Sequence, residues 1–355
     1  MNGPLILSQA RTRLAELIEA SNPAIPDPLA VSPWVAMSAL QKAVRRGEHA
    51  LAQRAAATLL RVAPEKLWRR LGAIAFEDVG VASFDTVFNV TCALGGKRLR
   101  GQWGGEWRTA DTLVQLLSEA PKCRAADDVL IAAERHPRYR RARHALAAKS
   151  VDELIRIATG RAEWPVRAIA AWFAVGTDRR PSPYMEKRRG DPAALFDALR
   201  ELGYPHTVAA ISWEGFRRIG EVLCPFVALL AAEAATIRGQ LQSDDLPPES
   251  SIRGVPGWAY DIYCREGRQA LQCFLRTDAP AATWVRQHVP RERWVAFLGD
   301  VLFRIEGGLV KNRLSWPTGC LLRKLADEEC YGPPEIFALM RLDLPRLNQE
   351  RANVC

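Results

Sequence analysis

The stretch SALQKAVRRG, residues 38–47, contains the features from which the fold of this chain can be predicted. Its apolar residues recur at helical spacing, and Gly47 stands where a left-handed helix end would fall. We therefore expect a helix from Trp34 to Arg46 that ends at Gly47. The same stretch raises a functional question, because its last two turns carry three cations.

Helical periodicity recurs along the rest of the chain, and strand signals are scarce. Ser150 to Glu153 matches a capping box, and Asp191-Pro192 matches an N-cap followed by proline at the first helical position. The most apolar stretch, residues 222–237, is interrupted by Glu233 and is too short to cross a membrane, so it predicts a core helix. The expected fold class is all-α and multi-helical, and a family resemblance carried by three sequence blocks implies a collar-like helical module at the N-terminal side.

A chain of 355 residues is too long for one ordinary core. We expect a basic helical module over residues 1–150, a middle helical segment over 151–245 and a C-terminal helical segment over 246–355. A repeated helical hairpin is a further possibility. Its two copies would align Pro64, Trp68, Gly72, Phe76 and Gly80 with Pro290, Trp294, Gly299, Phe303 and Gly307.

The net charge of +9 is distributed unevenly. Residues 1–150 contain 22 basic and 14 acidic residues, whereas residues 151–355 contain 27 and 26. This asymmetry favours an anionic partner such as nucleic acid, and the alternative is a basic surface that only aids solubility.

Three segments of the basic module supply candidate nucleic-acid contacts, because arginine forks bind phosphate and aromatic rings stack on bases. They are the helix end at 42–46, the glycine-rich stretch 95–108 and the run ERHPRYRRARH at 134–144. The candidate residues are Lys42, Arg45, Arg46, Lys97, Arg98, Arg100, Trp103, Arg108, Arg135, Arg138, Tyr139, Arg140, Arg141 and Arg143. Three structural alternatives remain open: cations that complement a helix dipole, cations that pair with Glu77 and Asp78, and tryptophans that fold into the core.

Catalytic motifs are lacking in the sequence. No G-x-x-x-x-G-K-[ST], H-E-x-x-H or G-x-S-x-G occurs, and the eight cysteines have neither CxxC nor zinc-ligand spacing. The cysteines are expected to be buried free thiols, and the N-terminus lacks the features of a signal peptide. We therefore expect a cytoplasmic protein without metal or cofactor, and a binding function more readily than an enzyme.

Three blocks carry a resemblance to a known family: SALQKAVRRG at 38–47, LWRRLGAIAFEDVG at 67–80 and APK at 120–122. In order and approximate spacing they resemble the C-terminal helical region of the replication-associated recombination protein A (MgsA-type) AAA+ ATPases, over about residues 34–135. The resemblance implies a helical, oligomer-forming module from proteins that act at stalled replication forks. It does not extend to the ATPase module, and Cys123-Arg124 replaces the Ser-Asn that follows Ala-Pro-Lys in the family.

The leading hypothesis is a non-catalytic nucleic-acid-associated protein of DNA replication or repair. It would bind DNA through an arginine-rich surface, form a homo-oligomer and act with a separate ATPase or replication protein, with no membrane contact. One alternative is a protein-interaction scaffold or inhibitor from a mobile element or a host–phage conflict. Another is an unrecognised hydrolase or nuclease.

Overall fold

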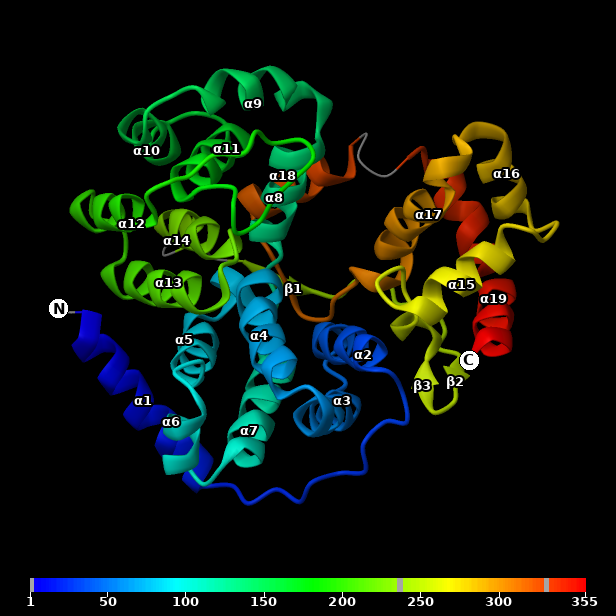
Figure 1. Cartoon of the computed structure of the whole chain (residues 1–355), viewed down its shortest axis with the longest axis horizontal. Helices are drawn as coiled ribbons and strands as arrows, with labels where there is room; N and C mark the ends of the chain where they lie inside the picture. Colours follow the sequence, from blue (N-terminus) through cyan, green and yellow to red (C-terminus); the bar gives the residue numbers. More distant parts are fainter. Residues whose placement is uncertain (1–2, 235–238, 329–331) are drawn as a thin grey trace. The chain divides into compact units, whose positions relative to one another are not determined.

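The structure, a computed structural model, describes residues 3–234, 239–328 and 332–355 and is predominantly helical (Figure 1). It confirms the all-α prediction, with nineteen α-helices and only short strands among the described residues. The chain divides into two compact units, each made of three separate segments. Unit 1 comprises residues 1–22, 71–242 and 312–330, and unit 2 comprises residues 23–70, 243–311 and 331–355. The expected boundary near residue 150 lies inside unit 1, and the one at 245 lies close to the division at 242/243.

Unit 1 contains α11, whose sequence is apolar apart from Arg167. Trp172 and Phe173 of this helix are fully buried, as expected for a helix with almost no polar surface. The α-helices and strands of unit 1 are α1 (Gly3–Glu19), α5 (Phe84–Ala93), α6 (Lys97–Gln102), α7 (Glu106–Glu119), α8 (Ala125–Arg135), α9 (Arg140–Ala147), α10 (Val151–Thr159), α11 (Trp164–Val175), α12 (Pro192–Glu201), α13 (His206–Ile219), α14 (Leu223–Ala234), β1 (Gln240–Gln242), β4 (Arg313–Ser315) and α18 (Pro317–Asp327).

Unit 2 has an apolar core formed by α15, α16, α17 and α19. Phe274, Leu298 and Met340 lie fully buried in it. The α-helices and strands of unit 2 are α2 (Pro33–Arg46), α3 (His49–Val62), α4 (Pro64–Ile74, which crosses the division at 70/71), β2 (Ser251–Ile252), β3 (Val255–Pro256), α15 (Arg265–Phe274), α16 (Pro280–His288), α17 (Trp294–Leu302) and α19 (Pro334–Val354). Short 3-10 turns occur at Gly80–Ala82 and Pro137–Tyr139 in unit 1, and at Gly257–Ala259 and Arg291–Arg293 in unit 2.

The local start and stop signals of the sequence act as predicted. The Ser32 hydroxyl accepts a hydrogen bond from the Val35 N–H at the start of α2, and Gly47 ends that helix at φ 67°. Ser150 and Glu153 form the complete capping box of α10. The Asp191 side chain caps α12 by accepting from the Ala194 N–H.

Two helices lead into a five-residue π-helix. α4 continues as Ala75–Val79, and α17 continues as Phe303–Gly307. The helix orders of the two proposed repeats differ, because α3 leads directly to α4 whereas α16 lies between α15 and α17. The similarity between the two proposed repeats is therefore limited to one helix and the π-helix that follows it.

The strands form two small antiparallel ladders. β1 pairs with β4 through Leu241 and Leu314, and β2 pairs with β3 through Ile252 and Val255. Lys122 extends β4 on its other side, where its N–H donates to Asn312 O at 2.9 Å and its carbonyl accepts from Leu314 N at 2.8 Å. The stretch 243–257, within the segments expected to be helical, contains the hairpin β2–β3.

The thiols agree with the expectation of burial only in part. Cys92, Cys123, Cys224 and Cys264 are buried free thiols, but Cys320 is exposed, and Cys330 lies outside the described residues. Within the described part of the chain, no helix combines the length and apolarity needed to cross a membrane.

Candidate nucleic-acid interface

The structure separates the candidate residues into an interior set and a surface set. Seven side chains are less than a tenth exposed: Lys42, Arg45, Arg46, Arg100, Trp103, Tyr139 and Arg143. Lys97, Arg98, Arg138, Arg140 and Arg141 are exposed, whereas Arg108 and Arg135 are half-buried. The prediction that the seven buried side chains bind nucleic acid is wrong for this fold, because a buried side chain cannot reach a polymer.

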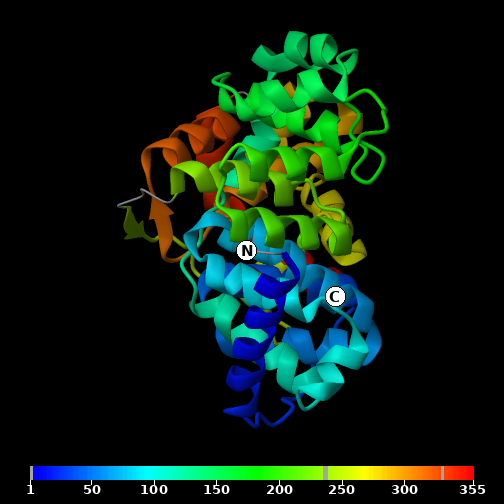
Figure 2. The same cartoon turned by 90° about the vertical axis from the view of Figure 1, so that its left-hand side faces the viewer.

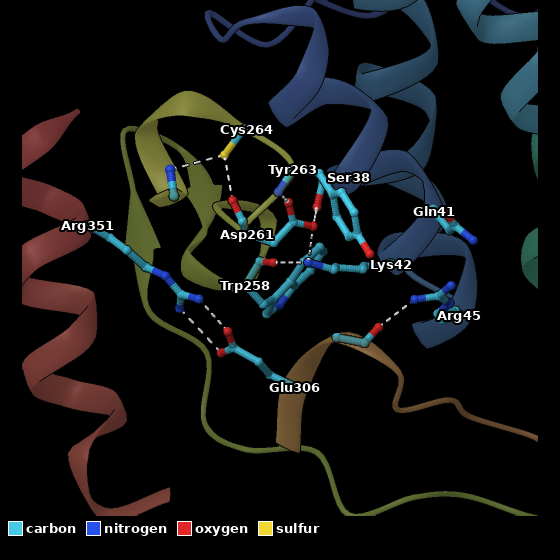
Figure 3. A network of polar contacts seen from close by, with 12 residues as sticks. Ser38, Gln41, Lys42, Arg45, Trp258, Asp261, Tyr263, Cys264, Glu306 and Arg351 are labelled. Carbon is cyan, nitrogen blue, oxygen red and sulfur yellow. Dashed lines mark hydrogen bonds and ion pairs between the residues drawn. The ribbon is translucent and has the colours of Figure 1, made fainter. Parts of the chain in front are cut away.

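Lys42 is an internal cation of unit 2 (Figure 3). Its Nζ donates to Asp261 Oδ2 at 2.8 Å and to the Trp258 carbonyl at 2.5 Å, while the Ser38 hydroxyl donates to the same Asp261 oxygen. Burial lowers the pKa of Lys42, and the Asp261 carboxylate offsets this only in part. Burial by itself would raise the pKa of Asp261, but the ammonium and the hydrogen bonds it accepts outweigh burial and lower it.

Arg45 and Arg46 bind the carbonyls at the end of the π-helix Phe303–Gly307. Arg45 Nη1 donates to Gly307 O and Arg46 Nη2 donates to Glu306 O, both at 2.6 Å. The Arg46 guanidinium also lies 4.3 Å from the centre of the Trp258 ring. Carbonyls at a helix end lack intrahelical donors, so these contacts satisfy groups that would otherwise be buried and unpaired. The cations at 42–46 therefore stabilise the interior of unit 2. They do not pair with Glu77 and Asp78, which contact a different arginine.

That arginine is Arg124, which follows Ala-Pro-Lys in unit 1. Its guanidinium pairs with the carboxylates of Glu77, Asp78 and Asp127, and it is 3% exposed. Asp78 lies in the π-helix Ala75–Val79, and its carbonyl accepts from Cys123 N at 2.8 Å. Gly80 follows with φ 49°, and a Cβ there would lie 2.8 Å from Cys123 O, so only glycine fits.

The stretch 95–108 is folded into unit 1 instead of forming an exposed loop. Arg100 binds the Ala93 carbonyl and the Glu106 carboxylate, and Arg108 Nη2 donates to Ile18 O at 3.0 Å. Trp103 is 7% exposed, so its ring does not present a stacking face. Lys97 and Arg98 alone keep the surface position expected for this segment.

The run 134–144 is likewise divided between interior and surface. Arg143 Nη1 donates to Ala133 O at 2.9 Å, and the Tyr139 hydroxyl donates to a Glu163 oxygen at 2.8 Å. Burial, with that hydrogen bond, raises the pKa of Tyr139 to about 12. The second Glu163 oxygen pairs with Arg138, so the acid at the N-cap of α11 partly neutralises the run. Arg140 and Arg141 of α9 remain on the surface.

The two remaining surface groups of unit 1 do not form one continuous strip. α6 carries Lys97 and Arg98, α9 carries Arg140 and Arg141, and the two helices lie at opposite ends of the unit (Figures 1 and 2). The structure therefore does not bring together the segments expected to share one phosphate-binding surface.

A different basic surface, the α15 face, lies on α15 and on Arg276 just after its end in unit 2, outside the candidate residues. Arg265, Arg268 and Arg276 line a groove of about 450 Å³ together with Gln269, Gln272 and Cys273. Arg268 Nη1 donates to the Ile262 carbonyl at 2.9 Å. Across the described ranges 3–234, 239–328 and 332–355, Arg265 and Arg276 make no ion pair or side-chain hydrogen bond. No carboxylate lines the groove, so nothing in its wall neutralises these charges.

Sequence reasoning missed α15 because the average charge of residues 151–355 is close to neutral. The available signal was periodicity. Gly267, Ala270, Leu271 and Phe274 are buried on one face, and the arginines and glutamines occupy the opposite face. Apart from Glu266 in the first turn, the polar residues of this helix are cations and amides, and most of them are exposed.

In the described residues, no group of three or more His, Cys, Asp or Glu side chains is placed to hold a metal ion. Comparison with protein-family models, with curated proteins and with solved structures finds no match to this chain. Evidence for a function of this protein therefore comes from the side-chain geometry within each unit and from the three sequence blocks at 38–47, 67–80 and 120–122.

Proposed function

We propose that this protein binds nucleic acid without transforming it, and that the arginine face of α15 is the principal contact. The observation that carries the proposal is the groove of Arg265, Arg268 and Arg276, which contains three cations and no acid. Guanidinium groups in such a setting bind phosphate through paired hydrogen bonds and release counterions from the polymer. The uncharged glutamines between them can donate to phosphate or sugar oxygens.

The choice of DNA, and a role in its replication or repair, rests on the resemblance to the MgsA-type C-terminal region. Self-association and a separate ATPase or replication partner are proposed on the same ground. All three blocks lie in helices or at their ends: residues 38–47 end α2, residues 67–80 cover most of α4 with its π-helix, and residues 120–122 follow α7.

Fluorescence anisotropy with labelled single- and double-stranded DNA tests the proposal. Wild-type protein should bind with an affinity that falls as salt rises. The variant Arg268→Ala/Arg276→Ala should bind about tenfold more weakly, and its logarithmic salt slope should be smaller by about 2. Both side chains are exposed, so the variant should fold normally.

Matched variants locate the interface. Lys97→Ala/Arg98→Ala removes the same number of surface cations from α6 and should leave binding nearly unchanged. Arg138→Ala/Arg140→Ala/Arg141→Ala tests the position that the sequence indicated. A loss confined to this triple variant would contradict the assignment to α15, and binding without salt dependence would contradict the nucleic-acid function.

A further inference from the structure

A second hollow adjoins the α15 groove and differs from it in chemistry. Its volume is about 580 Å³, within the range of pockets that hold small organic ligands. Arg265 and Gln269 line both the groove and this hollow. The other walls come from the approach to α2, the end of α3, the β2–β3 turn and the end of α19, all in unit 2.

Three arginines from separate elements line the hollow. Arg61 belongs to α3, Arg253 to the β2–β3 turn and Arg265 to α15. In the described part of the chain, none of the three makes an ion pair or a side-chain hydrogen bond. Glu266 is the one acidic side chain among the lining residues, so the lining side chains carry an excess of two positive charges before the terminal carboxylate of Cys355 is counted. A compact anionic ligand would offset the remaining positive charge.

The backbone at Arg253 is an independent sign of function. Arg253 has φ 52° and Gly254 has φ 75°, so both central residues of this two-residue turn are left-handed. Asn-Gly is the usual sequence of such a turn, and arginine there costs of order 1 kcal/mol. An arginine in a strained position at the rim of a cationic hollow indicates that its charge is used.

The remaining wall is apolar and suits an organic group. Leu29, Val31, Val35 and Val62 are among the residues that line the hollow. Tyr260 also lines it, and its hydroxyl donates to the Ile252 carbonyl at 3.3 Å, which holds the ring in place. A bare inorganic ion would leave this surface unused, whereas a base or another ring would cover it.

We infer that the hollow binds a phosphate monoester whose organic group packs on the apolar wall, as in a nucleoside monophosphate or the 5′-phosphorylated end of a strand. The strand-end form rests on the proposed nucleic-acid function, and the free form does not. The phosphate would lie among Arg61, Arg253 and Arg265. The carboxylates of an acidic peptide are the competing ligand class, and they fit the apolar wall less well.

Calorimetric titration with adenosine 5′-monophosphate, adenosine and inorganic phosphate tests the site. The monophosphate should bind, adenosine should not, and inorganic phosphate should bind at least tenfold more weakly. Arg253→Gly should weaken the binding of the monophosphate about tenfold or more. The substitution removes the charge, and glycine suits the left-handed turn. Arg140→Ala, at an exposed position in unit 1, should not change monophosphate binding. Equal binding of adenosine, an unchanged Arg253→Gly variant, or displacement by a tetraglutamate peptide would overturn the inference.

A paired oligonucleotide experiment separates this inference from the proposed function. A 5′-phosphorylated strand should bind more tightly than the same strand with a 5′-hydroxyl, and Arg253→Gly should abolish only that difference. Binding that is equal for both strands, with no monophosphate binding, would end the inference and leave the proposed function standing. Binding of the monophosphate without binding of either strand would support the inference and contradict the proposed nucleic-acid function.

Discussion

The end of α2 and the outer face of α15 are both basic helical segments of unit 2, and they use their cations in opposite ways. Lys42, Arg45 and Arg46 are all less than a tenth exposed, and each contacts a carboxylate or a carbonyl group. Arg265 and Arg276 are exposed at a groove with no acid in its wall. The density of positive charge along the sequence is therefore a poor guide to where an anion binds.

The distribution of apolar residues distinguishes the two helices. In α2 the buried residues run without a break from Ala39 to Arg46, so the cations have no outer face to occupy. In α15 the buried positions form one stripe, which leaves the arginines on the opposite side. A basic residue beside apolar neighbours on every side is better interpreted as an internal partner of an acid or a carbonyl.

The largest expected effect lies at the buried cation of unit 1. Arg124→Met leaves the carboxylates of Asp78 and Asp127 buried without their cation, which should cost about 3–5 kcal/mol of unfolding free energy. Denaturant unfolding followed by tryptophan fluorescence measures it. Arg140→Met, at an exposed position in the same unit, is the control and should change stability by less than about 0.5 kcal/mol. Equal effects of the two variants would break the distinction between interior and surface cations.

The next effect is a pH dependence at Lys122, which is 1% exposed and donates to the carbonyls of Ser118 and Ala120. Burial lowers the pKa of Lys122 to about 8 from an ordinary 10.5. Between these values the unfolded chain binds more protons, so stability should rise with pH, by about 3 kcal/mol in total, and should be independent of this group below pH about 8. Lys122→Met should lack this rise. The two pH profiles, measured by denaturant unfolding, would be parallel if the ammonium were solvated.

A smaller loss is expected at Lys42. Lys42→Met removes a buried ammonium, which is itself costly to bury, but leaves the Asp261 carboxylate without its ion pair. The net loss should be about 2 kcal/mol. Adding Asp261→Asn should recover part of it, and the double-variant cycle measures the coupling. Additive losses would show that the pair does not act as a unit.

The smallest effect on stability belongs to α15. Arg268→Ala/Arg276→Ala should change the thermal midpoint by less than about 2 °C, because the side chains lie on the surface. The same variant should show the loss of DNA binding described above. A large loss of stability would mean that these arginines resemble those of α2, and would weaken the comparison.

Much of the local structure was predictable, because capping boxes, proline starts and the left-handed Gly47 act over a few residues. The surroundings of each cation were not. The partners of Lys42 and Arg46 lie more than two hundred residues away in the sequence, and the acid beside Arg138 lies at the N-cap of α11. The division into interleaved units has the same origin, since segments far apart in the chain share one core. Two exceptions were within reach: the amphipathic pattern of α15, and Arg253 before a glycine in a two-residue turn.

Arginine modification by phenylglyoxal, mapped by mass spectrometry with and without DNA, tests the central claim directly. The account predicts that Arg265, Arg268 and Arg276 react in the free protein and are protected by DNA. It also predicts that Arg45, Arg46 and Arg124 stay unmodified in both conditions. Rapid modification of Arg45 and Arg46, with protection by DNA there and none on α15, would contradict it.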